Sequence, residues 1–466
     1  MLTKVKKRRK IQKILLILPP RTFIKDAESK RSYPPLGLAY IAALLEDEYE
    51  VKIIDTIVEG FYTEVQAGEG LFRYGLTYKE ISLKIKEFSP DVVGISCIEV
   101  LQSEEAHEIC KIVKNIDKNI ITVMGGIYPS SLPYQAMEDD NIDFLIMGEG
   151  EFSFRGLIKS IESGRSFSEL DGLAFRKNGH SIIVTKKRYI ENLDILPLPA
   201  RHLLPMNRYP VVCPAPFCER ITKRTPYTMM ITSRGCPMRC SFCATHLVWS
   251  RKFRLRPVEE VLKEIKILIN EGFKEIHFFD DNLTYDKRRA AKIFDGIIEQ
   301  GLDITWYSAP GVAVSSLDKD LLIKMEKSGC YRVGIPIETA NQQLLNQIKK
   351  PLNLEKVPEI VRMVKDLGMY ADGFFMIGFP GETKEDLQRT LDFAMSLGLD
   401  HSVFCIVTPF PGTELYDICI KKGFLRKDVP LRDFRLSKGV IRTSDLSPEY
   451  LEKFRKEAWL KINFSY

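Results

Sequence analysis

The segment SRGCPMRCSFCATH (residues 233–246) places three cysteines within eight positions. Three and then two residues separate Cys236, Cys240 and Cys243, and the segment directly follows a short apolar run, YTMMITS. Three thiolates on one short loop can bind one face of a metal site. A structural zinc site needs a fourth ligand, for which only His246 is near. A four-iron, four-sulfur cluster held by three cysteines leaves one iron open. The sequence favours the cluster, with zinc and three ordinary thiols as alternatives.

The residues that follow the cysteines alternate strand and helix patterns. Six apolar runs read as strands, and helices are expected to start near Pro257, Asp286, Asp318, Asn341 and Lys384. This alternation predicts a partial (β/α)6, TIM-like barrel over residues 227–424. The chemistry of such barrels lies at the carboxyl ends of the strands, where the cysteine segment leaves the first strand. The six runs are YTMMITS, EIHFFDD, DITWYS, RVGIPIE, YADGFFMIG and SVFCIVTP.

The first part of the chain, residues 13–165, has a similar alternation. Five apolar runs, KILLIL, VKIID, VVGIS, ITVMG and FLIMG, are rich in β-branched residues, as in strands covered on both faces. They predict a doubly wound parallel sheet, whose ligands bind at the carboxyl ends of the strands. Those ends carry Ser96, Gly125–Gly126 and Gly148–Glu149–Gly150. A hairpin around Asn178–Gly179 and a proline-rich linker are expected over residues 166–226.

Composition bounds the class of protein. The 466 residues are too many for one hydrophobic core, and a net charge of +6 is far from that of a dedicated nucleic-acid binder. Residues 1–12 form a basic arm, and residues 425–466 a tail with one expected helix over 448–462. No run is long enough to span a membrane and none reads as an export signal. We therefore expect a cytoplasmic protein in a reducing compartment, with peripheral attachment to a membrane left open.

The cysteine segment resembles the radical SAM superfamily, whose hallmark is Cys-x3-Cys-x2-Cys with an aromatic residue before the last cysteine, here Phe242. The resemblance implies that Cys236, Cys240 and Cys243 hold a [4Fe–4S] cluster whose open iron binds S-adenosyl-L-methionine (SAM). Reductive cleavage of SAM would give a 5′-deoxyadenosyl radical, with the electron supplied by a donor such as flavodoxin or ferredoxin.

Other strand ends resemble the SAM-binding positions of that superfamily. In FFDDN, Asp280 and Asp281 stand where acceptors meet the methionine ammonium, although a helix N-cap with surface charge is an alternative. Glu338 in IPIETANQQLL resembles the ribose-contacting carboxylate, but Thr339–Ala340 replaces the usual Ser-Gly. In FFMIGFPGET, Gly378 would let the backbone approach the adenine, and a simple strand-to-helix turn is the alternative. The match extends to TPFPGTELYD after the sixth strand.

The first part of the chain is similar to the Rossmann-like cobalamin-binding domain of one radical SAM subgroup. The matching runs are PPLGLAYIAALL, DVVGIS, GGIYPSSLP and DFLIMGEGE. The resemblance implies cobalamin contacts from Ser96, Gly125, Gly126, Tyr128, Gly148 and Glu149. The Asp-x-His-x-x-Gly motif that ligates cobalt in other corrinoid proteins is absent, and Tyr128 stands where the subgroup often has histidine. We expect a structural role for His107 and cobalamin without a protein histidine on cobalt.

These features predict an enzyme that uses a [4Fe–4S] cluster, SAM and cobalamin. The leading hypothesis is methylation of an unactivated carbon through the 5′-deoxyadenosyl radical and methylcobalamin. The second is a cobalamin-dependent radical cyclase, oxidation or rearrangement enzyme without methyl transfer. A non-catalytic corrinoid or iron–sulfur module and a methylthiotransferase are further alternatives. The substrate is expected to be a small molecule such as a lipid, a tetrapyrrole or a natural product.

Overall fold

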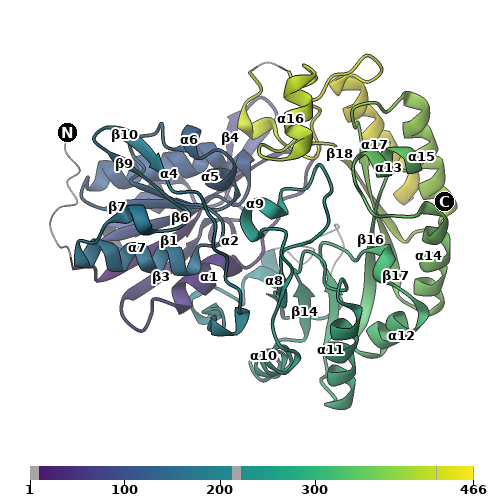
Figure 1. Cartoon of the computed structure of the whole chain (residues 1–466), viewed down its shortest axis with the longest axis horizontal. Helices are drawn as coiled ribbons and strands as arrows, with labels where there is room; N and C mark the ends of the chain where they lie inside the picture. The colour runs from purple at the N-terminus through teal and green to yellow at the C-terminus, as the bar shows by residue number, and fades with distance from the viewer. Residues whose placement is uncertain (1–9, 213–221, 427, 465–466) are drawn as a thin grey trace. The chain divides into compact units, whose positions relative to one another are not determined.

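The structure, a computed structural model, describes residues 10–212, 222–426 and 428–464. The chain divides into two compact units, each an α/β unit built on a parallel sheet (Figure 1). Unit 1 comprises residues 1–213 together with His246–Ser250, and unit 2 comprises the other residues. The hairpin and most of the linker predicted over 166–226 therefore belong to unit 1.

Unit 1 contains a seven-stranded sheet in the order β10-β9-β8-β7-β6-β1-β3. Its five parallel strands coincide with the five predicted ones: β1 (Lys13–Leu18), β3 (Glu50–Asp55), β6 (Val92–Ser96), β7 (Ile121–Gly125) and β8 (Phe144–Ile146). The predicted hairpin forms β9 (Leu173–Lys177) and β10 (His180–Ile183), which extend the sheet antiparallel to β8. Its turn residues, Asn178 and Gly179, both have positive φ, as the turn type requires.

Helices cover both faces of this sheet, since successive residues of β1 and of β6 are buried on alternating faces. Helix α1 packs against α7, and α3 packs against α4. The helices of unit 1 up to residue 163 are α1 (Leu36–Ala43), α2 (Thr56–Glu59), α3 (Tyr78–Phe88), α4 (Ser103–Ile116), α5 (Ile127–Ser131), α6 (Pro133–Ala136) and α7 (Glu151–Ser163).

Two parts of unit 1 are not predicted by the sequence pattern. A separate antiparallel sheet, β2-β5-β4, is formed by β2 (Arg21–Ile24), β4 (Glu64–Gly68) and β5 (Leu71–Tyr74). The proline-rich linker includes α8 (Tyr209–Val212) and packs on the unit, because the buried Tyr209 hydroxyl donates to Asp55 Oδ2 at 2.8 Å. Residues 213–221 of the predicted linker lie outside the described residues, as do residues 1–9 of the predicted basic arm.

Unit 2 contains a six-stranded sheet whose strands are all parallel and follow chain order. The six predicted runs form β11 (Tyr227–Met230), β14 (Glu275–Phe278), β15 (Thr305–Ser308), β16 (Cys330–Glu338), β17 (Tyr370–Ile377) and β18 (His401–Ile406). A small hairpin pairs β12 (Ser233–Arg234) with β13 (Arg254–Leu255). This strand order is what consecutive strand–helix units produce.

The predicted helix starts of unit 2 are confirmed. Asp286, Asp318 and Asn341 cap their helices with side-chain hydrogen bonds, Pro257 is the N-cap of its helix, and Lys384 is the first residue of α15. The helices are α9 (Thr245–Trp249, mostly in unit 1), α10 (Val258–Asn270), α11 (Lys287–Glu299), α12 (Lys319–Lys327), α13 (Gln342–Gln347), α14 (Val357–Asp366), α15 (Lys384–Ser396), α16 (Glu414–Lys421) and α17 (Pro448–Phe464). Neither α14 nor α16 is among the predicted starts.

The C-terminal tail is part of unit 2. Its predicted helix is α17, which lies along β18: Arg455 Nε donates to Phe404 O at 3.0 Å, and the Ser402 N–H donates to Asn463 Oδ1 at 3.0 Å. Helix α17 therefore covers the last strand of the sheet.

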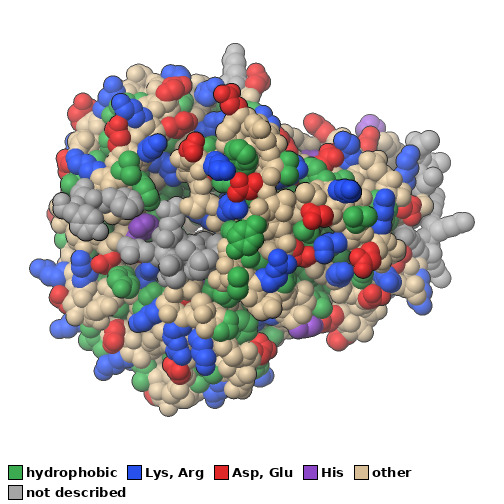
Figure 2. Space-filling view, turned by 180° about the vertical axis from the view of Figure 1, so that it is seen from behind, with side chains coloured by type: hydrophobic (Ala, Val, Ile, Leu, Met, Phe, Trp, Pro, Cys, Tyr) green, Lys and Arg blue, Asp and Glu red, His purple; other side chains and the backbone are tan. Residues whose placement is uncertain are grey.

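Charged side chains of both signs are intermingled on the face shown in Figure 2, in keeping with the near balance of charge in the sequence. Within the described residues, no helix combines the length and the apolar character that a membrane crossing needs.

Candidate functional site

The segment with the three cysteines follows β11 at the carboxyl edge of the unit 2 sheet, and backbone contacts tie it down along its length. The Ser241 N–H donates to Ile348 O, and Ser241 O accepts from Leu415 N, each at 2.9 Å. Arg251 donates to Met238 O at 2.8 Å. These contacts fix the loop from residues far away in the sequence, which is why its conformation cannot be inferred from the cysteine spacing.

Cys236, Cys240 and Cys243 are half-buried, and they lie close enough for the charges of their sulfurs to interact. Burial raises the pKa of Cys236 and raises that of Cys240 to about 11, although the Lys350 ammonium opposes the shift at Cys240. The thiolate forms that ligate a metal therefore depend on a bound cation to stabilise them.

The set of donors fits an iron–sulfur cluster better than a zinc ion. Among the described residues, no group of three or more His, Cys, Asp or Glu side chains could hold a single metal ion. A structural zinc ion needs four ligands that converge on one point. A cube of four irons instead spreads its cysteines over separate irons, so its ligands stand farther apart.

The two adjacent aspartates after β14 hold the cysteine loop. Asp280 Oδ1 accepts from Thr232 Oγ1 at 2.7 Å and Ser233 Oγ at 2.5 Å, and both of its oxygens lie 3.1 Å from Thr232 N. Asp280 is fully buried and its oxygens already accept these donors, and its predicted contact with SAM stays a prediction.

Asp281 anchors the loop more loosely. Its Oδ2 accepts from Gly235 N at 3.1 Å and its Oδ1 from Thr245 Oγ1 at 3.3 Å. Burial raises the pKa of Asp281 to about 6, against the effect of the Gly235 N–H. Each oxygen accepts one of these hydrogen bonds, so a contact with the SAM ammonium stays a prediction.

Asn282 is a third polar residue at this strand end. Its Nδ2 lies 4.0 Å from Cys236 Sγ, at the limit of a sulfur hydrogen bond, and its Oδ1 is buried with no hydrogen-bond partner in the described part of the chain. A buried amide oxygen without a partner is costly in an isolated protein. A ligand that brings a hydrogen-bond donor to this end of the sheet, such as the ammonium of SAM, would give Asn282 Oδ1 a partner.

Glu338 ends β16 and is paired with a lysine. Lys350 Nζ donates to Glu338 Oε1 at 2.6 Å, and both side chains are nearly buried. Burial alone would lower the pKa of Lys350, but Glu338 and Cys240 together raise it. Glu338 has a φ of 69°, in the region that favours glycine, so the surrounding contacts must hold this strand end in place. Lys350 lies twelve residues beyond Glu338 and was not among the predicted site residues.

A buried carboxylate, also missed, organises the end of β17. Glu382 Oε2 accepts from Gly378 N at 2.7 Å and Phe379 N at 2.8 Å, and burial raises the pKa of Glu382 to about 7. Gly378 has a φ of 93°, and a Cβ there would stand 2.7 Å from a methyl of Leu451. Packing therefore already explains the glycine, and its contact with adenine stays a prediction.

Phe242, the aromatic residue before the last cysteine, contacts this same strand end. Its ring packs against the edge of Phe379 with 5.7 Å between centroids and 61° between planes. Through this contact, Phe242 connects the cysteine loop to the end of β17. Its contact with SAM stays a prediction.

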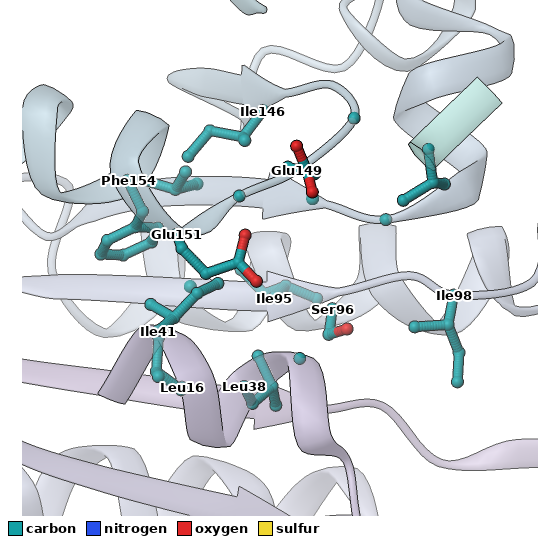
Figure 3. Close-up of a pocket in the computed structure, with 18 of the residues that line it drawn as sticks. Leu16, Leu38, Ile41, Ile95, Ser96, Ile98, Ile146, Glu149, Glu151 and Phe154 are labelled. Atoms are coloured by element: carbon teal, nitrogen blue, oxygen red, sulfur yellow. The ribbon is translucent and has the colours of Figure 1, made fainter. Parts of the chain in front are cut away.

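Unit 1 contains an apolar cavity at the carboxyl ends of β1, β6, β7 and β8 (Figure 3). Its empty space, taken out to the open mouth, is about 900 Å³. In Figure 3, Leu16, Ile41 and Phe154 gather at one end of the cavity, and Ser96 and Ile98 lie toward the other. A Cβ on Gly94 would stand 2.7 Å from Leu16 and 3.0 Å from Phe154, so this glycine lets the two side chains close over the strand.

Five of the six residues predicted to contact cobalamin line this cavity: Ser96, Gly125, Gly126, Gly148 and Glu149. Tyr128 does not line it. Its hydroxyl lies 2.9 Å from His107 Nε2, and His107 Nδ1 lies 2.6 Å from Asp139 Oδ2. The structural role predicted for His107 is therefore confirmed.

Other lining residues were not predicted. Leu16 and Phe154 carry no signal beyond the apolar pattern that any core residue shares, and Ile41 lies within the matching run PPLGLAYIAALL without having been singled out. Glu151 lies within a matching run, but it was not singled out. Val248 and Trp249 come from the segment His246–Ser250, which is remote in sequence from the rest of unit 1.

The cavity fits cobalamin in shape and chemistry. Cβ atoms on Gly126 and Gly148 would meet backbone or side-chain atoms at 2.3 Å and 3.0 Å, so glycine alone keeps these two turns in their present form. Such turns let a flat ring approach the backbone. Glu149 and Glu151 line the cavity and are nearly buried, and their carboxylates would be acceptors for the amide groups at the edge of a bound corrin.

Comparison with known proteins agrees with these two sites. A family model described as the Radical SAM superfamily matches residues 230–394, and one described as a B12 binding domain matches residues 26–158. An uncharacterised methyltransferase of Pyrococcus horikoshii is 34% identical over 455 residues, which is 97% of this chain and 93% of that protein. Cytidylyl-2-hydroxyethylphosphonate methyltransferase of Streptomyces wedmorensis is 34% identical, over 94% of this chain and 87% of that protein.

More distant relatives share the same fold. Anaerobic magnesium-protoporphyrin IX monomethyl ester cyclase of Rubrivivax gelatinosus is 26% identical, over 86% of this chain and 69% of that protein. The solved structure of the cobalamin-dependent S-adenosylmethionine radical enzyme OxsB superposes with a TM-score of 0.74 at 17% identity, over 98% of this chain and 67% of that one.

The chain belongs to the radical SAM superfamily, in the group whose members also carry a B12-binding domain. It is a cobalamin-dependent radical SAM enzyme, and its cofactors are a [4Fe–4S] cluster, SAM and cobalamin.

Proposed function

We propose that this enzyme methylates an unactivated carbon of a small-molecule substrate. The observation that carries the proposal is that one chain holds a three-cysteine loop at a parallel-sheet edge and a glycine-walled cavity that fits cobalamin. Two relatives that match almost the whole chain at 34% identity are named methyltransferases. The proposal includes a partial (β/α)6 barrel for unit 2 and a Rossmann-like arrangement for unit 1.

The protein's own part in this reaction is to hold its cofactors and exclude water. When bound, the cluster and SAM supply a 5′-deoxyadenosyl radical, and cobalamin carries the methyl group. Cys236, Cys240 and Cys243 would bind the cluster, while Asp280 and Asp281 keep their loop in place. The loop is tied through backbone atoms as well, so little reorganisation is needed when the cluster binds.

SAM would lie over the carboxyl edge of the unit 2 sheet. Asn282 Oδ1 and Asp281 would accept hydrogen bonds from its ammonium, and the Glu338–Lys350 pair would stand beside its ribose and carboxylate. The backbone at Gly378, held by Glu382, would face the adenine, with Phe242 packed alongside. Asp280 has no direct part in this arrangement, because its oxygens are used within the protein.

The substrate belongs to the same proposal. The Streptomyces relative is named for a nucleotide-linked phosphonate, which makes that compound a reasonable first substrate to test. Lipids, tetrapyrroles and other natural products are the wider class. An electron donor such as flavodoxin or ferredoxin and a cytoplasmic location are further parts of the proposal.

The test is anaerobic turnover of the full chain. Protein reconstituted with iron, sulfide and cobalamin is reduced and incubated with SAM and cytidylyl-2-hydroxyethylphosphonate, and then with an extract of small metabolites. Methyl transfer from one SAM and radical formation from another predict equal amounts of S-adenosylhomocysteine and 5′-deoxyadenosine. Cys240→Ala should abolish 5′-deoxyadenosine. Formation of that nucleoside without S-adenosylhomocysteine or a methylated product would exclude methylation.

A radical cyclase, oxidation or rearrangement is the second candidate function. The specific observation in its favour is the cyclase relative at 26% identity. It predicts 5′-deoxyadenosine with a product of unchanged carbon count in the assay above. The lower identity of that relative favours methylation as the first hypothesis.

A further inference from the structure

The two glycine turns that wall the unit 1 cavity come from different strands. Gly125–Gly126 follow β7, and Gly148 follows β8. Gly126 has a φ of 112° and Gly148 a φ of 69°, and these are conformations that other residues rarely adopt. Glycine permits such turns but does not hold them, because it is also the most flexible residue. Contacts from elsewhere must set the spacing between the two turns.

One hydroxyl group joins the two turns. Ser130 Oγ donates to Gly126 O at 2.7 Å and accepts from Gly148 N at 2.9 Å. The first of these bonds, back to the residue four positions earlier, is common for serine in a helix. The second is not local, because it crosses from α5 to the end of β8. Ser130 therefore uses its O–H donor and one of its two acceptor lone pairs to connect the two turns directly.

Tyr128 fixes the same helix from the opposite side. Asp139 Oδ1 accepts from both the backbone and the side chain of Asn141, at 2.9 and 2.7 Å, which orients the carboxylate. The other oxygen, Oδ2, lies 2.6 Å from His107 Nδ1, so that nitrogen is the protonated one. In a neutral ring with its proton on Nδ1, His107 Nε2 is the acceptor of the hydrogen bond with the Tyr128 hydroxyl, at 2.9 Å. This chain of hydrogen bonds leads away from the cavity.

We propose that Ser130 is a positioning residue for cobalamin: it sets the distance between the two glycine turns, and Tyr128, anchored through His107 and Asp139, holds the helix that carries it. Neither side chain ligates cobalt. This inference rests on the cobalamin-binding domain and not on methyl transfer, so its test measures cobalamin alone.

The experiment compares two neighbouring serines. Ser130→Ala removes the hydroxyl that bridges the turns, whereas Ser131→Ala removes one that makes only a local bond to Tyr128 O at 3.1 Å. Binding of hydroxocobalamin to the full chain is measured by equilibrium dialysis, and the folding of each apo-protein by thermal melting. Loss of Ser130 leaves a part-buried N–H and C=O without this partner, so affinity should fall about tenfold or more, while S131A stays within about twofold. Ser130→Thr keeps the hydroxyl and should restore most of the affinity.

A second variant keeps the proposal testable if S130A does not fold. Tyr128→Phe removes only the hydroxyl, and it should weaken hydroxocobalamin binding several-fold. The electron paramagnetic resonance spectrum of bound cob(II)alamin should not change, because Tyr128 does not touch cobalt. Unchanged affinity in S130A, an equal loss in S131A, or a changed cobalt spectrum in Y128F would each overturn the proposal.

Discussion

Adjacent glycines at the end of β7 provide a sharp test of how the cavity holds cobalamin. Gly125 and Gly126 both line it, but an added methyl group would meet different surroundings at the two positions. At Gly126 the Cβ would stand 2.3 Å from Cys97 O, roughly 1 Å short of ordinary contact, and φ is 112°. At Gly125 its nearest neighbour would be Ile146 O at 3.6 Å, an ordinary contact.

The two substitutions should therefore differ in kind. A residue other than glycine at the φ of Gly126 costs about 1–3 kcal/mol. Adding the overlap with a backbone oxygen gives a total of at least about 3 kcal/mol. If the turn keeps its form, Gly126→Ala lowers the stability and the melting temperature of the apo-protein by this strain. If the turn shifts to relieve the strain, restoring it on binding lowers cobalamin affinity more than about a hundredfold instead. Gly125→Ala should change stability by less than about 1 kcal/mol. If the corrin lies against this backbone, the new methyl group should still cost about tenfold in affinity.

Equilibrium dialysis of hydroxocobalamin and thermal melting of the apo-protein distinguish the outcomes. A loss of affinity without loss of stability in G125A supports direct approach of the ring to the backbone. Unchanged affinity in G125A would refute that approach. If G126A matched G125A in both affinity and melting temperature, the argument from backbone strain would be wrong.

Three further predictions concern unit 2. Asp280→Asn should lower the melting temperature and the iron content after reconstitution, because the substitution loses about 1.5–3 kcal/mol of charged hydrogen bonds. Asp281→Asn should have a smaller effect on both quantities. Equal effects of the two substitutions would contradict the anchoring role of Asp280. Lys350→Met removes a cation beside Cys240. The reduction potential of the cluster, measured by an EPR-monitored redox titration, should therefore become more negative by on the order of tens of millivolts. The control is Lys349→Met, which removes an exposed lysine next in sequence and should not shift the potential. The pKa of Glu382 is raised to about 7 in the folded protein. The protonated side chain therefore stabilises the fold fully below the unfolded pKa of about 4.5, and this stabilisation is lost as the pH rises through 7. Glu382→Gln should therefore flatten the decline in stability between pH 5 and 8 by up to about 3 kcal/mol, and parallel profiles for both proteins would count against it.

Local signals predicted the elements well. Asp286, Asp318 and Asn341 mark helix starts because each side chain can accept a hydrogen bond from its own first turn, an interaction that requires nothing from the rest of the chain. The glycines at strand ends could be found for a similar reason, since the rule that ligands bind at the carboxyl edge depends only on strand direction. The sequence thus specified the two parallel sheets and the five glycine, serine and glutamate residues predicted to line the cavity.

Interactions between distant residues could not be predicted in this way. Lys350 reaches Glu338 only because α13 turns back toward the end of β16, and no spacing rule indicates the pair. In the sheet β2-β5-β4, the strands β2 and β5 pair residues about fifty positions apart, which no local pattern indicates. Strands β4 and β5 form a local hairpin around Glu69–Gly70, but their side chains do not alternate between apolar and polar as a half-buried strand would. Tyr209 is buried in unit 1 although prolines interrupt every periodic pattern around it.

The case of Asp280 shows why a carboxylate at a strand end is ambiguous. A carboxylate at this position can accept hydrogen bonds from a cationic ligand or from protein donors at the end of the neighbouring strand. The sequence alone does not distinguish these two roles. The role depends on the number of donors that the fold brings to each carboxylate. Asp280 accepts hydrogen bonds from Thr232 and Ser233. Asp281 accepts one from the Gly235 N–H and a longer one, at 3.3 Å, from the Thr245 hydroxyl. Of the two neighbours, Asp281 accepts fewer hydrogen bonds and is less buried, so it is better placed to accept from a ligand.

The direction of the side chains of α5 also determines which residues line the cavity. Ile127 and Tyr128 are consecutive residues in α5, so their side chains diverge by about 100° around the helix and only one can face the cavity. Ile127 faces it, and Tyr128 points toward His107. Among the described residues that line the cavity there is no histidine, cysteine or methionine, and the side-chain oxygens come from Ser96, Glu149 and Glu151. A helix turned by one residue would bring a phenol to the cofactor, and its present orientation instead uses that phenol to stiffen the turn against which cobalamin would rest.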